Sequence, residues 1–237
     1  MSRIEKQPQR SAAENLRRKV RKRFATILAD PPWQFQNRTG KMAPEHRRLL
    51  RYPTMKLKEI LDLPVPILAA ERSHLYLWVP NALLAEGIEV MRGWGFTYKT
   101  NLVWYKVRKD GGPDGRGVGF YFRNVTELVL FGVRGSMRTL KPGRTQVNLF
   151  STRKREHSRK PDEIYNIIEA CSPGPYLELF ARFRQPGWRQ WGNENVMENS
   201  VSGVALRNGH VDSQLRLIKP PKGYRVARGT RQKSALA

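Results

Sequence analysis

Apolar residues along the chain gather in short continuous runs that are rich in β-branched and aromatic types. A continuous run of this length is typical of a strand that is buried on both faces, as in a parallel sheet. We therefore expect five strands, at residues 24–29, 74–79, 97–107, 126–133 and 176–181.

Between these runs, apolar residues recur at spacings of three and four, which is the period of one face of a helix. Three helices are expected: one after Asn81 with the face Leu84, Ile88 and Met91, one after Pro161 with the face Ile164, Ile167, Ile168 and Cys171, and a short one after Thr54 with the face Leu57, Ile60 and Leu61. Alternating strands and helices predict parallel βαβ units in a doubly wound α/β fold. A chain of 237 residues is long enough for one such domain.

The first expected strand ends abruptly at Asp30-Pro31-Pro32-Trp33. Each proline fixes its own φ and lacks an N–H, and the residue before a proline is held in extended geometry. The result is a stiff corner that carries a carboxylate, free carbonyls and a large aromatic ring. In open α/β sheets, ligands bind at this carboxyl edge.

The corner suits methylation of an exocyclic amino group on a base. The lone pair of the adenine amino nitrogen is delocalised into the ring, and hydrogen bonds from its two N–H groups to a carboxylate and a carbonyl favour its localisation. Asp30 and the Pro31 carbonyl supply those acceptors, and Trp33 supplies a ring that can stack on the base. The simpler alternative is a turn in which Asp30 is a turn former and Trp33 a core residue.

Asp30-Pro31-Pro32-Trp33 resembles the catalytic motif of the MT-A70 family of adenine amino-methyltransferases. Further matches follow in the family's order: Tyr52-Pro53-Thr54-Met55, Leu75-Tyr76-Leu77-Trp78-Val79, Trp94-Gly95-Phe96, Glu127 before Leu128-Val129-Leu130-Phe131-Gly132-Val133-Arg134-Gly135, Lys160-Pro161-Asp162-Glu163-Ile164-Tyr165, Glu178-Leu179-Phe180-Ala181-Arg182 and Trp191-Gly192-Asn193. The resemblance covers roughly residues 24–195. It implies a Rossmann-like, doubly wound class I methyltransferase fold with a circularly permuted motif order.

The resemblance also implies S-adenosylmethionine as the cofactor and assigns roles to residues. The catalytic residues would be Asp30, Pro31, Pro32 and Trp33, and the cofactor-binding residues Asp30, Lys160, Phe180, Arg182, Asn193 and Glu194. The chain departs from the family where Ala181 replaces the glycine of a Phe-Gly-Arg motif, and where Arg184-Gln185 replaces an asparagine region.

The extent of the resemblance divides the chain into three parts, all of them basic. The formal net charge is +24, and Lys and Arg are in excess within residues 1–23, 24–196 and 197–237 alike. We expect a basic N-terminal arm, a methyltransferase domain and a basic C-terminal tail with these bounds. An excess of this size favours a nucleic-acid partner, which would be bound through its phosphates. Non-specific adhesion to polyanions is the alternative.

Two long loops are candidates for substrate contact. Residues 34–53 follow the corner directly, and Tyr52 could close over the bound base or only pack the loop down. Residues 108–123 interleave glycines, basic residues and aromatics, so Arg116, Phe120 and Arg123 could contact phosphates and bases. A flexible surface loop would show the same composition. Glu127, just beyond the loop, is a further candidate for substrate binding.

Other features limit the choice of function. No run of 18 apolar residues predicts a membrane span, and no apolar segment near the N-terminus predicts a secretory signal. The single cysteine, Cys171, fits a reducing compartment, so we expect a cytoplasmic protein. Four scattered histidines show no metal-ligand spacing, and no metal is expected.

We therefore expect an S-adenosylmethionine-dependent adenine methyltransferase. The small size, the basic tails and the lack of RNA-binding zinc motifs favour DNA as the nucleic-acid partner. Two alternatives stay open: an RNA adenine methyltransferase, and a catalytically silent nucleic-acid-binding scaffold on the same fold. The sequence leaves the oligomeric state open.

Overall fold

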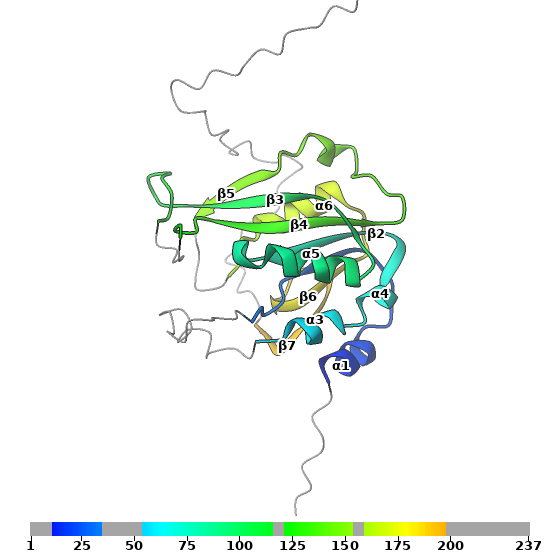
Figure 1. Cartoon of the computed structure of the whole chain (residues 1–237). Coiled ribbons are helices and arrows are strands. Elements are labelled where there is room, and N and C mark those ends of the chain that lie inside the picture. The colour runs from blue at the N-terminus through cyan, green and yellow to red at the C-terminus, as the bar shows by residue number, and fades with distance from the viewer. Residues whose placement is uncertain (1–10, 35–53, 116–120, 154–158, 198–237) are drawn as a thin grey trace, which may run out of the picture. The chain divides into compact units, whose positions relative to one another are not determined.

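The computed structural model describes residues 11–34, 54–115, 121–153 and 159–197, with the backbone alone at position 142 and at 193–197. Within this part of the chain, seven strands form one sheet in the order β5-β3-β4-β2-β1-β6-β7 (Figure 1). The strands are β1 (Phe24–Ala29), β2 (Ala69–Val79), β3 (Thr97–Val107), β4 (Thr126–Arg134), β5 (Leu149–Arg153), β6 (Tyr176–Phe183) and β7 (Trp188–Met197). Only β4 runs against its neighbours, and the other adjacent pairs are parallel.

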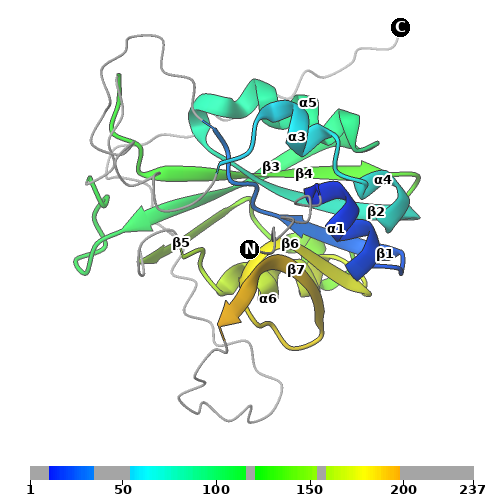
Figure 2. The ribbon, with the colours of Figure 1, turned by 90° about the horizontal axis from the view of Figure 1, so that it is seen from below.

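Helices cover both faces of the sheet, as Figure 2 shows. They are α1 (Ala12–Lys19), α3 (Leu57–Leu61), α4 (Val65–Leu68), α5 (Leu84–Gly93) and α6 (Glu163–Cys171), with short 3₁₀ turns η1 (Asn81–Leu83) and η2 (Pro142–Thr145). Helices α1, α3, α4 and α5 contribute to one apolar core and α6 to the other. The doubly wound α/β class expected from the sequence is confirmed.

Strict alternation along the central strands creates the two cores. Ile27 and Ala29 of β1 face the first core, whereas Leu28 faces the second. On β2, Leu77 faces the first core and Trp78 the second, so successive side chains point to opposite faces of the sheet. Strands buried on both faces need no polar positions, which explains why the sequence shows them as continuous apolar runs.

The register places the end of β1 at the centre of the carboxyl edge. Ala29 pairs with Leu77 of β2 on one side and with Leu179 of β6 on the other. The chain leaves β1 through α3 and α4 on one face, and enters β6 through α6 on the opposite face. The edge between β1 and β6 is therefore a topological switch point, where this class of sheet binds ligands.

Helix α1 packs onto the sheet from within the range that we expect to be a basic arm. Ser11 caps it in a capping box with Glu14. Leu16 is fully buried in the first core, and the Trp191 indole donates a hydrogen bond to Asn15 Oδ1 at 3.0 Å. Residues 12–20 thus contribute to the domain's core.

The five expected strands are all present, and three of them are longer than predicted. The sequence does not predict β5 and β7, because these are the two edge strands of the sheet and carry many polar residues. The expected helices are present as well. Lys56 directly precedes α3, and the Asn81 side chain donates to the Thr126 carbonyl at 3.2 Å, so it ties η1 to β4. In the part of the chain described, no helix is both long and apolar enough to span a membrane.

Candidate active site

Backbone hydrogen bonds hold the corner after β1 in a defined shape. The Asp30 N–H donates to the Leu179 carbonyl at 3.4 Å, which extends the pairing of β1 with β6 by one residue. The Trp33 N–H folds back onto the Pro31 carbonyl at 2.8 Å, and the Met55 N–H donates to the Pro32 carbonyl at 2.9 Å. Asp30 is therefore fixed at the switch point.

Trp33 anchors the corner from inside the protein. Its side chain is only 6% exposed, and the indole N–H donates to the Trp78 carbonyl at 2.9 Å. Stacking on a base requires an exposed ring face, which this placement does not offer. The stacking role that we expect for Trp33 is replaced by a structural one, because burying the ring fixes the corner that presents Asp30.

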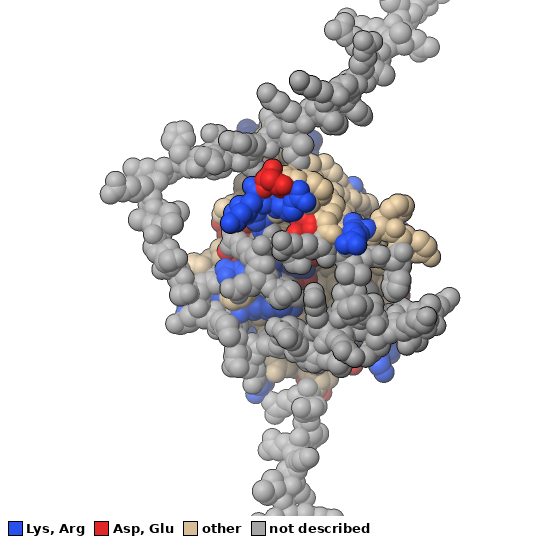
Figure 3. All heavy atoms as spheres, turned by 90° about the vertical axis from the view of Figure 1, so that its left-hand side faces the viewer, with Lys and Arg blue, Asp and Glu red and all other residues tan. Residues whose placement is uncertain are grey.

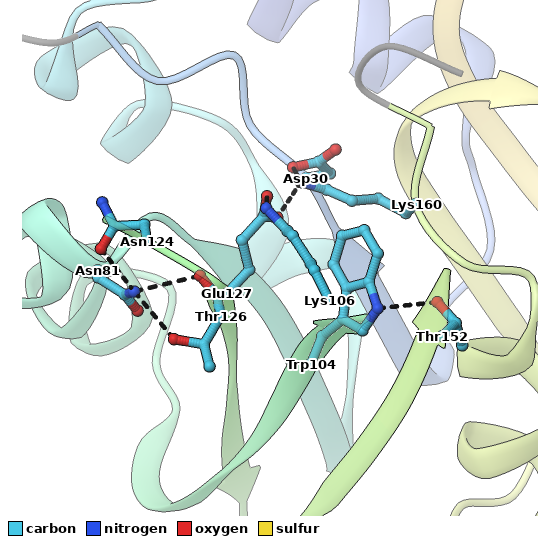
Figure 4. A network of polar contacts seen from close by, with 9 residues as sticks. All are labelled: Asp30, Asn81, Trp104, Lys106, Asn124, Thr126, Glu127, Thr152 and Lys160. Carbon is cyan, nitrogen blue, oxygen red and sulfur yellow. Dashed lines mark hydrogen bonds and ion pairs between the residues drawn. The ribbon is translucent and has the colours of Figure 1, made fainter. Parts of the chain in front are cut away.

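Lys160 joins Asp30 to a second carboxylate, as Figure 4 shows. Its ammonium nitrogen lies 3.3 Å from Asp30 Oδ1 and 2.8 Å from Glu127 Oε2. The same nitrogen lies over the Trp78 ring, 4.7 Å from its centroid. The side chains of Asp30, Lys160 and Glu127 are each 24–27% exposed, so the cluster is accessible to a ligand but largely removed from water.

Lys106 extends the cluster on the opposite side of Glu127. Its ammonium binds Glu127 Oε1 and lies 5.0 Å from the centroid of the Trp104 ring. The Trp104 indole N–H is in turn held by Thr152 Oγ1 at 2.9 Å (Figure 4). The result is a chain of alternating charges: Lys106, Glu127, Lys160, Asp30.

Burial and charge shift the pKa values of these groups in different directions. Burial raises the pKa of Asp30 above its ordinary value, and the positive charge of Lys160 only partly offsets this. Burial would also raise the pKa of Glu127, but Lys160 and Lys106 outweigh it and hold that pKa at about 2. For Lys160, the two carboxylates outweigh burial and raise the pKa. Asp30 is thus the more basic carboxylate of the two.

A pocket opens beside Asp30, between the ends of β1 and β6 and the start of α6. Lys160, Phe180 and Arg182 line it together with Asp30. Phe180 has a φ of +66°, which a bulky L-residue adopts only when its surroundings hold it there. Such outliers cluster at binding sites, and this one lies at the switch point.

Glu178 lies in the wall of the same pocket. Its carboxylate accepts hydrogen bonds from the Tyr165 hydroxyl at 2.9 Å and from the Gln190 amide at 2.7 Å. Burial raises the pKa of Glu178 to about 7. These bonds link β6 to both α6 and β7 behind the pocket.

Comparison with known proteins shows the family to which this chain belongs. A sequence model of the MT-A70 family matches residues 24–194, which include the corner and every residue of the cluster. The chain belongs to the MT-A70 family. MT-A70 methyltransferases use S-adenosylmethionine as methyl donor and act on adenine.

Relatives of the MT-A70 chain include bacterial and animal proteins. The Type II methyltransferase M.MunI of a Mycoplasma species is 33% identical over 197 residues, which cover 76% of this chain and 81% of that enzyme. The N(6)-adenosine-methyltransferase subunit METTL3 of Danio rerio is 31% identical over 202 residues, or 84% of this chain and 31% of the relative. Human METTL3, a catalytic subunit, is 31% identical over 176 residues, or 73% and 28%. The chain thus spans most of the bacterial relative and under a third of the animal ones.

The pocket fits the methyl donor of the MT-A70 family chemically. S-adenosylmethionine carries a carboxylate, a sulfonium cation, ribose hydroxyls and an adenine. The pocket offers three cationic side chains, three carboxyl side chains and the Phe180 ring for these groups. Asn193 and Glu194 follow on β7, where the structure describes the backbone alone. Gly192 is required there, since an added Cβ would lie 2.0 Å from the Ala181 carbonyl oxygen.

Of the residues expected to contact substrate, the structure describes two, and one of these lies in the ionic cluster. Glu127 lies in the ionic cluster, whereas the exposed Arg123 donates to the Gly115 carbonyl at 3.1 Å beyond the end of β3. Tyr52, Arg116 and Phe120 lie outside the described residues. In the part of the chain described, no group of three or more His, Cys, Asp or Glu side chains could hold a metal ion.

Sequence analysis misses Lys106, Trp78 and Glu178 as site residues. A weak signal exists for Lys106, because it follows Trp104 by two positions on an expected strand and so shares its face. Nothing in the sequence pairs Lys106 with Glu127, because that contact depends on the antiparallel register of β3 with β4.

Proposed function

We propose that this chain methylates the N6 amino group of adenine in DNA, and that Asp30 is the residue that orients the amino group. The observation that carries the proposal is the placement of the Asp30 carboxylate at the switch point. It lies beside a pocket whose side chains complement the chemical groups of the donor. Adenine must leave its stack to reach this depth, so the substrate is a flipped or single-stranded base.

Asp30 and the Pro31 carbonyl act on the two N–H bonds of the amino group. Each accepts one of them, which favours a nitrogen lone pair directed towards the methyl donor. The Pro31 carbonyl already accepts from the Trp33 N–H and has a second lone pair for the base. When bound, the donor supplies an electrophilic methyl group on sulfur. The raised pKa of Asp30 suits it to accept the proton that the nitrogen loses after methylation.

Cationic residues of the pocket hold the donor in this proposal. Lys160 keeps its ammonium between Asp30 and Glu127 and offers a remaining N–H to the donor carboxylate. Arg182, with Asn193 and Glu194, binds the ribose and adenine of the donor. Positioning by these groups carries much of the rate, because alignment replaces a bimolecular encounter.

We prefer DNA over RNA because of the relatives. The chain spans 81% of a bacterial Type II methyltransferase, whereas it spans 28–31% of the adenosine-methyltransferases from animals. Lys and Arg side chains are also visible beside a few acidic ones on the face drawn in Figure 3. That surface and the net charge of +24 support binding through phosphates. A cytoplasmic location follows from the same proposal.

The segment before β4 is the proposed contact for bases that flank the target. Tyr121 and Phe122 are 93% and 86% exposed, and Arg123 follows directly. Replacing both aromatics by serine should weaken binding of single-stranded DNA by about 1–3 kcal/mol per stacked base, because each ring offers a stacking surface. Thermal stability should not change, since neither ring is buried. Fluorescence anisotropy with labelled oligonucleotides measures the affinity, and equal binding by the variant would contradict the contact.

The deciding experiment is transfer of labelled methyl from S-adenosylmethionine to single- and double-stranded DNA and RNA, each with and without adenine. We expect adenine-dependent label in DNA, and none with the variant Asp30→Ala. Label in RNA alone would make RNA the substrate in place of DNA. Failure to bind the donor by calorimetry, alongside tight nucleic-acid binding, would favour a catalytically silent scaffold.

A further inference from the structure

Glu127 is held by two lysines, one on each carboxylate oxygen. Lys106 of β3 binds Oε1, and Lys160, which precedes α6, binds Oε2. Lys160 in turn reaches Asp30 at the end of β1 (Figure 4). Four segments that are distant in the sequence thus contribute one charge each to a single chain of ion pairs.

The charges in this row of ion pairs balance only because Lys106 is present. Two ammonium groups face two carboxylates, so Lys160 need not neutralise Glu127 alone. Without Lys106, one ammonium would be shared by two carboxylates, and the Glu127 contact at 2.8 Å is already shorter than the Asp30 contact at 3.3 Å. Attraction between partly buried charges is strong enough to pull Lys160 towards Glu127.

We propose that Lys106 is a positioning residue of the methyltransferase: by neutralising Glu127, it keeps Lys160 available to Asp30 and to the donor carboxylate. The inference rests on the proposed function for its catalytic consequence, but its effect on Asp30 is independent of turnover. Lys106 acts through Glu127 and Lys160 and touches neither the base nor the donor.

The surroundings of Lys106 are built to hold an ammonium at this position. Its side chain is 13% exposed and lies over the Trp104 ring, whose negative face attracts a cation. Thr152 of β5 fixes that ring through the indole N–H. A lysine serving only solubility would extend into water, whereas this one is kept against Glu127.

Other charged groups also affect the ionisation of Asp30. Arg182 of β6 stabilises its ionised form together with Lys160, and Glu127 opposes it. Glu178 of β6 and Asp162, next to α6, also line the pocket. Tyr165 of α6 faces the pocket as well, with its hydroxyl bonded to Glu178. Removing Lys106 leaves Lys160 as the one ammonium that Glu127 and Asp30 share, so the ionised form of Asp30 becomes less favourable.

The test follows the titration of the Asp30 carboxyl carbon by ¹³C NMR in the full chain, with Asp30→Asn used to assign the signal. In Lys106→Met, we expect the titration midpoint to rise by about half a pH unit or more, because Glu127 then draws Lys160 away from Asp30 and its own negative charge is less neutralised. Lys106→Arg should restore the midpoint. Lys99→Met, an exposed lysine of the same strand, is the matched control and should change nothing.

A second pair of variants tests whether Lys106 acts on Asp30 through Glu127. In a Glu127→Gln background, Lys106→Met should no longer move the Asp30 midpoint, because the charge that Lys106 neutralises is gone. A midpoint that moves equally in both backgrounds would overturn the proposal, as would an unchanged midpoint in Lys106→Met. Thermal melts show whether each variant is folded.

The kinetic consequence is measured on the substrate that the wild-type chain methylates. Lys106→Met should raise the KM for S-adenosylmethionine several-fold. It should also move the acid limb of kcat/KM to higher pH, together with the NMR midpoint. Wild-type protein without any methylation would contradict the proposed function, whereas an unmoved Asp30 titration would contradict the role of Lys106. The two failures are therefore distinguishable.

Discussion

At the scale of single residues, Asp30 combines its proposed catalytic role with a cost in stability. Its folded pKa lies above its ordinary value of 3.8, so the folded protein favours the protonated form. The stability that Asp30 contributes is therefore fully present below its ordinary pKa. It is lost as the pH rises through the pKa of Asp30 in the folded protein. Glu127 has the opposite sign, because its pKa is held at about 2, and its contribution is lost only as the pH falls from 4.5 towards 2.

Asp30→Asn should therefore abolish methyl transfer without lowering the melting temperature at pH 7. The amide cannot accept a proton, and it removes a carboxylate whose ionisation is unfavourable in the fold. Methylation assays and thermal melts measure the two effects. In the wild type, kcat/KM should fall on acidification at a pH above the ordinary range of an aspartate. An acid limb near pH 3 would contradict this.

Trp33 contributes through packing. Trp33→Ala should lower the free energy of unfolding by about 3–5 kcal/mol, because it removes a buried ring from the first core. Trp33→Phe retains most of the apolar contact and loses the bond to the Trp78 carbonyl, which should cost about 1 kcal/mol. Urea denaturation gives both values. If Trp33→Ala were as stable as wild type yet bound adenine poorly, the stacking role would return.

At the scale of elements, α1 shows how a charged segment joins the core. Three of its eight residues are Arg17, Arg18 and Lys19, all exposed, while Leu16 is fully buried. A basic composition therefore coexists with a narrow apolar face, on which Ala12 and Ala13 pack against the core beside Leu16. Sequence analysis detects the charge more readily than this face, because two of its apolar residues, Ala12 and Ala13, are small.

Leu16→Ala should lower the free energy of unfolding by about 2–5 kcal/mol if α1 is part of the cooperative unit. Arg17→Ala and Arg18→Ala, on the exposed side of the same helix, should stay within about 0.5 kcal/mol of wild type. Denaturant titration compares the three variants. A Leu16→Ala protein as stable as the arginine variants would show that α1 folds independently of the sheet.

At the scale of the whole molecule, the net charge of +24 should govern the affinity for nucleic acid. Each phosphate neutralised by the protein releases counterions, so the logarithm of the binding constant should fall linearly with that of the salt concentration. Between 50 and 200 mM salt, we expect at least a roughly tenfold loss of DNA affinity. Calorimetry with S-adenosylmethionine is the control and should show a much smaller change, because few charges are involved. A flat salt dependence for DNA would contradict phosphate binding.

The sequence by itself determines the class of fold, the central strands and the corner at Asp30. These depend on local chemistry: continuous apolar runs predict strands buried on both faces, and two prolines dictate the backbone after Asp30 whatever surrounds it. From the family resemblance of the ordered motifs we expect Lys160 and Arg182 to bind the methyl donor, and the structure places both in the pocket beside Asp30.

Only the tertiary structure decides which side chains share a site. Whether Trp33 stacks on a base or fills a core depends on the packing of β2 and α3, which no local pattern reveals. The link from Lys106 through Glu127 to Lys160 requires the register of β3 with β4 and the arrival of the segment before α6 at the same edge. Ionic contacts have no sequence period, because they join residues far apart in the chain, and folding alone brings those residues together.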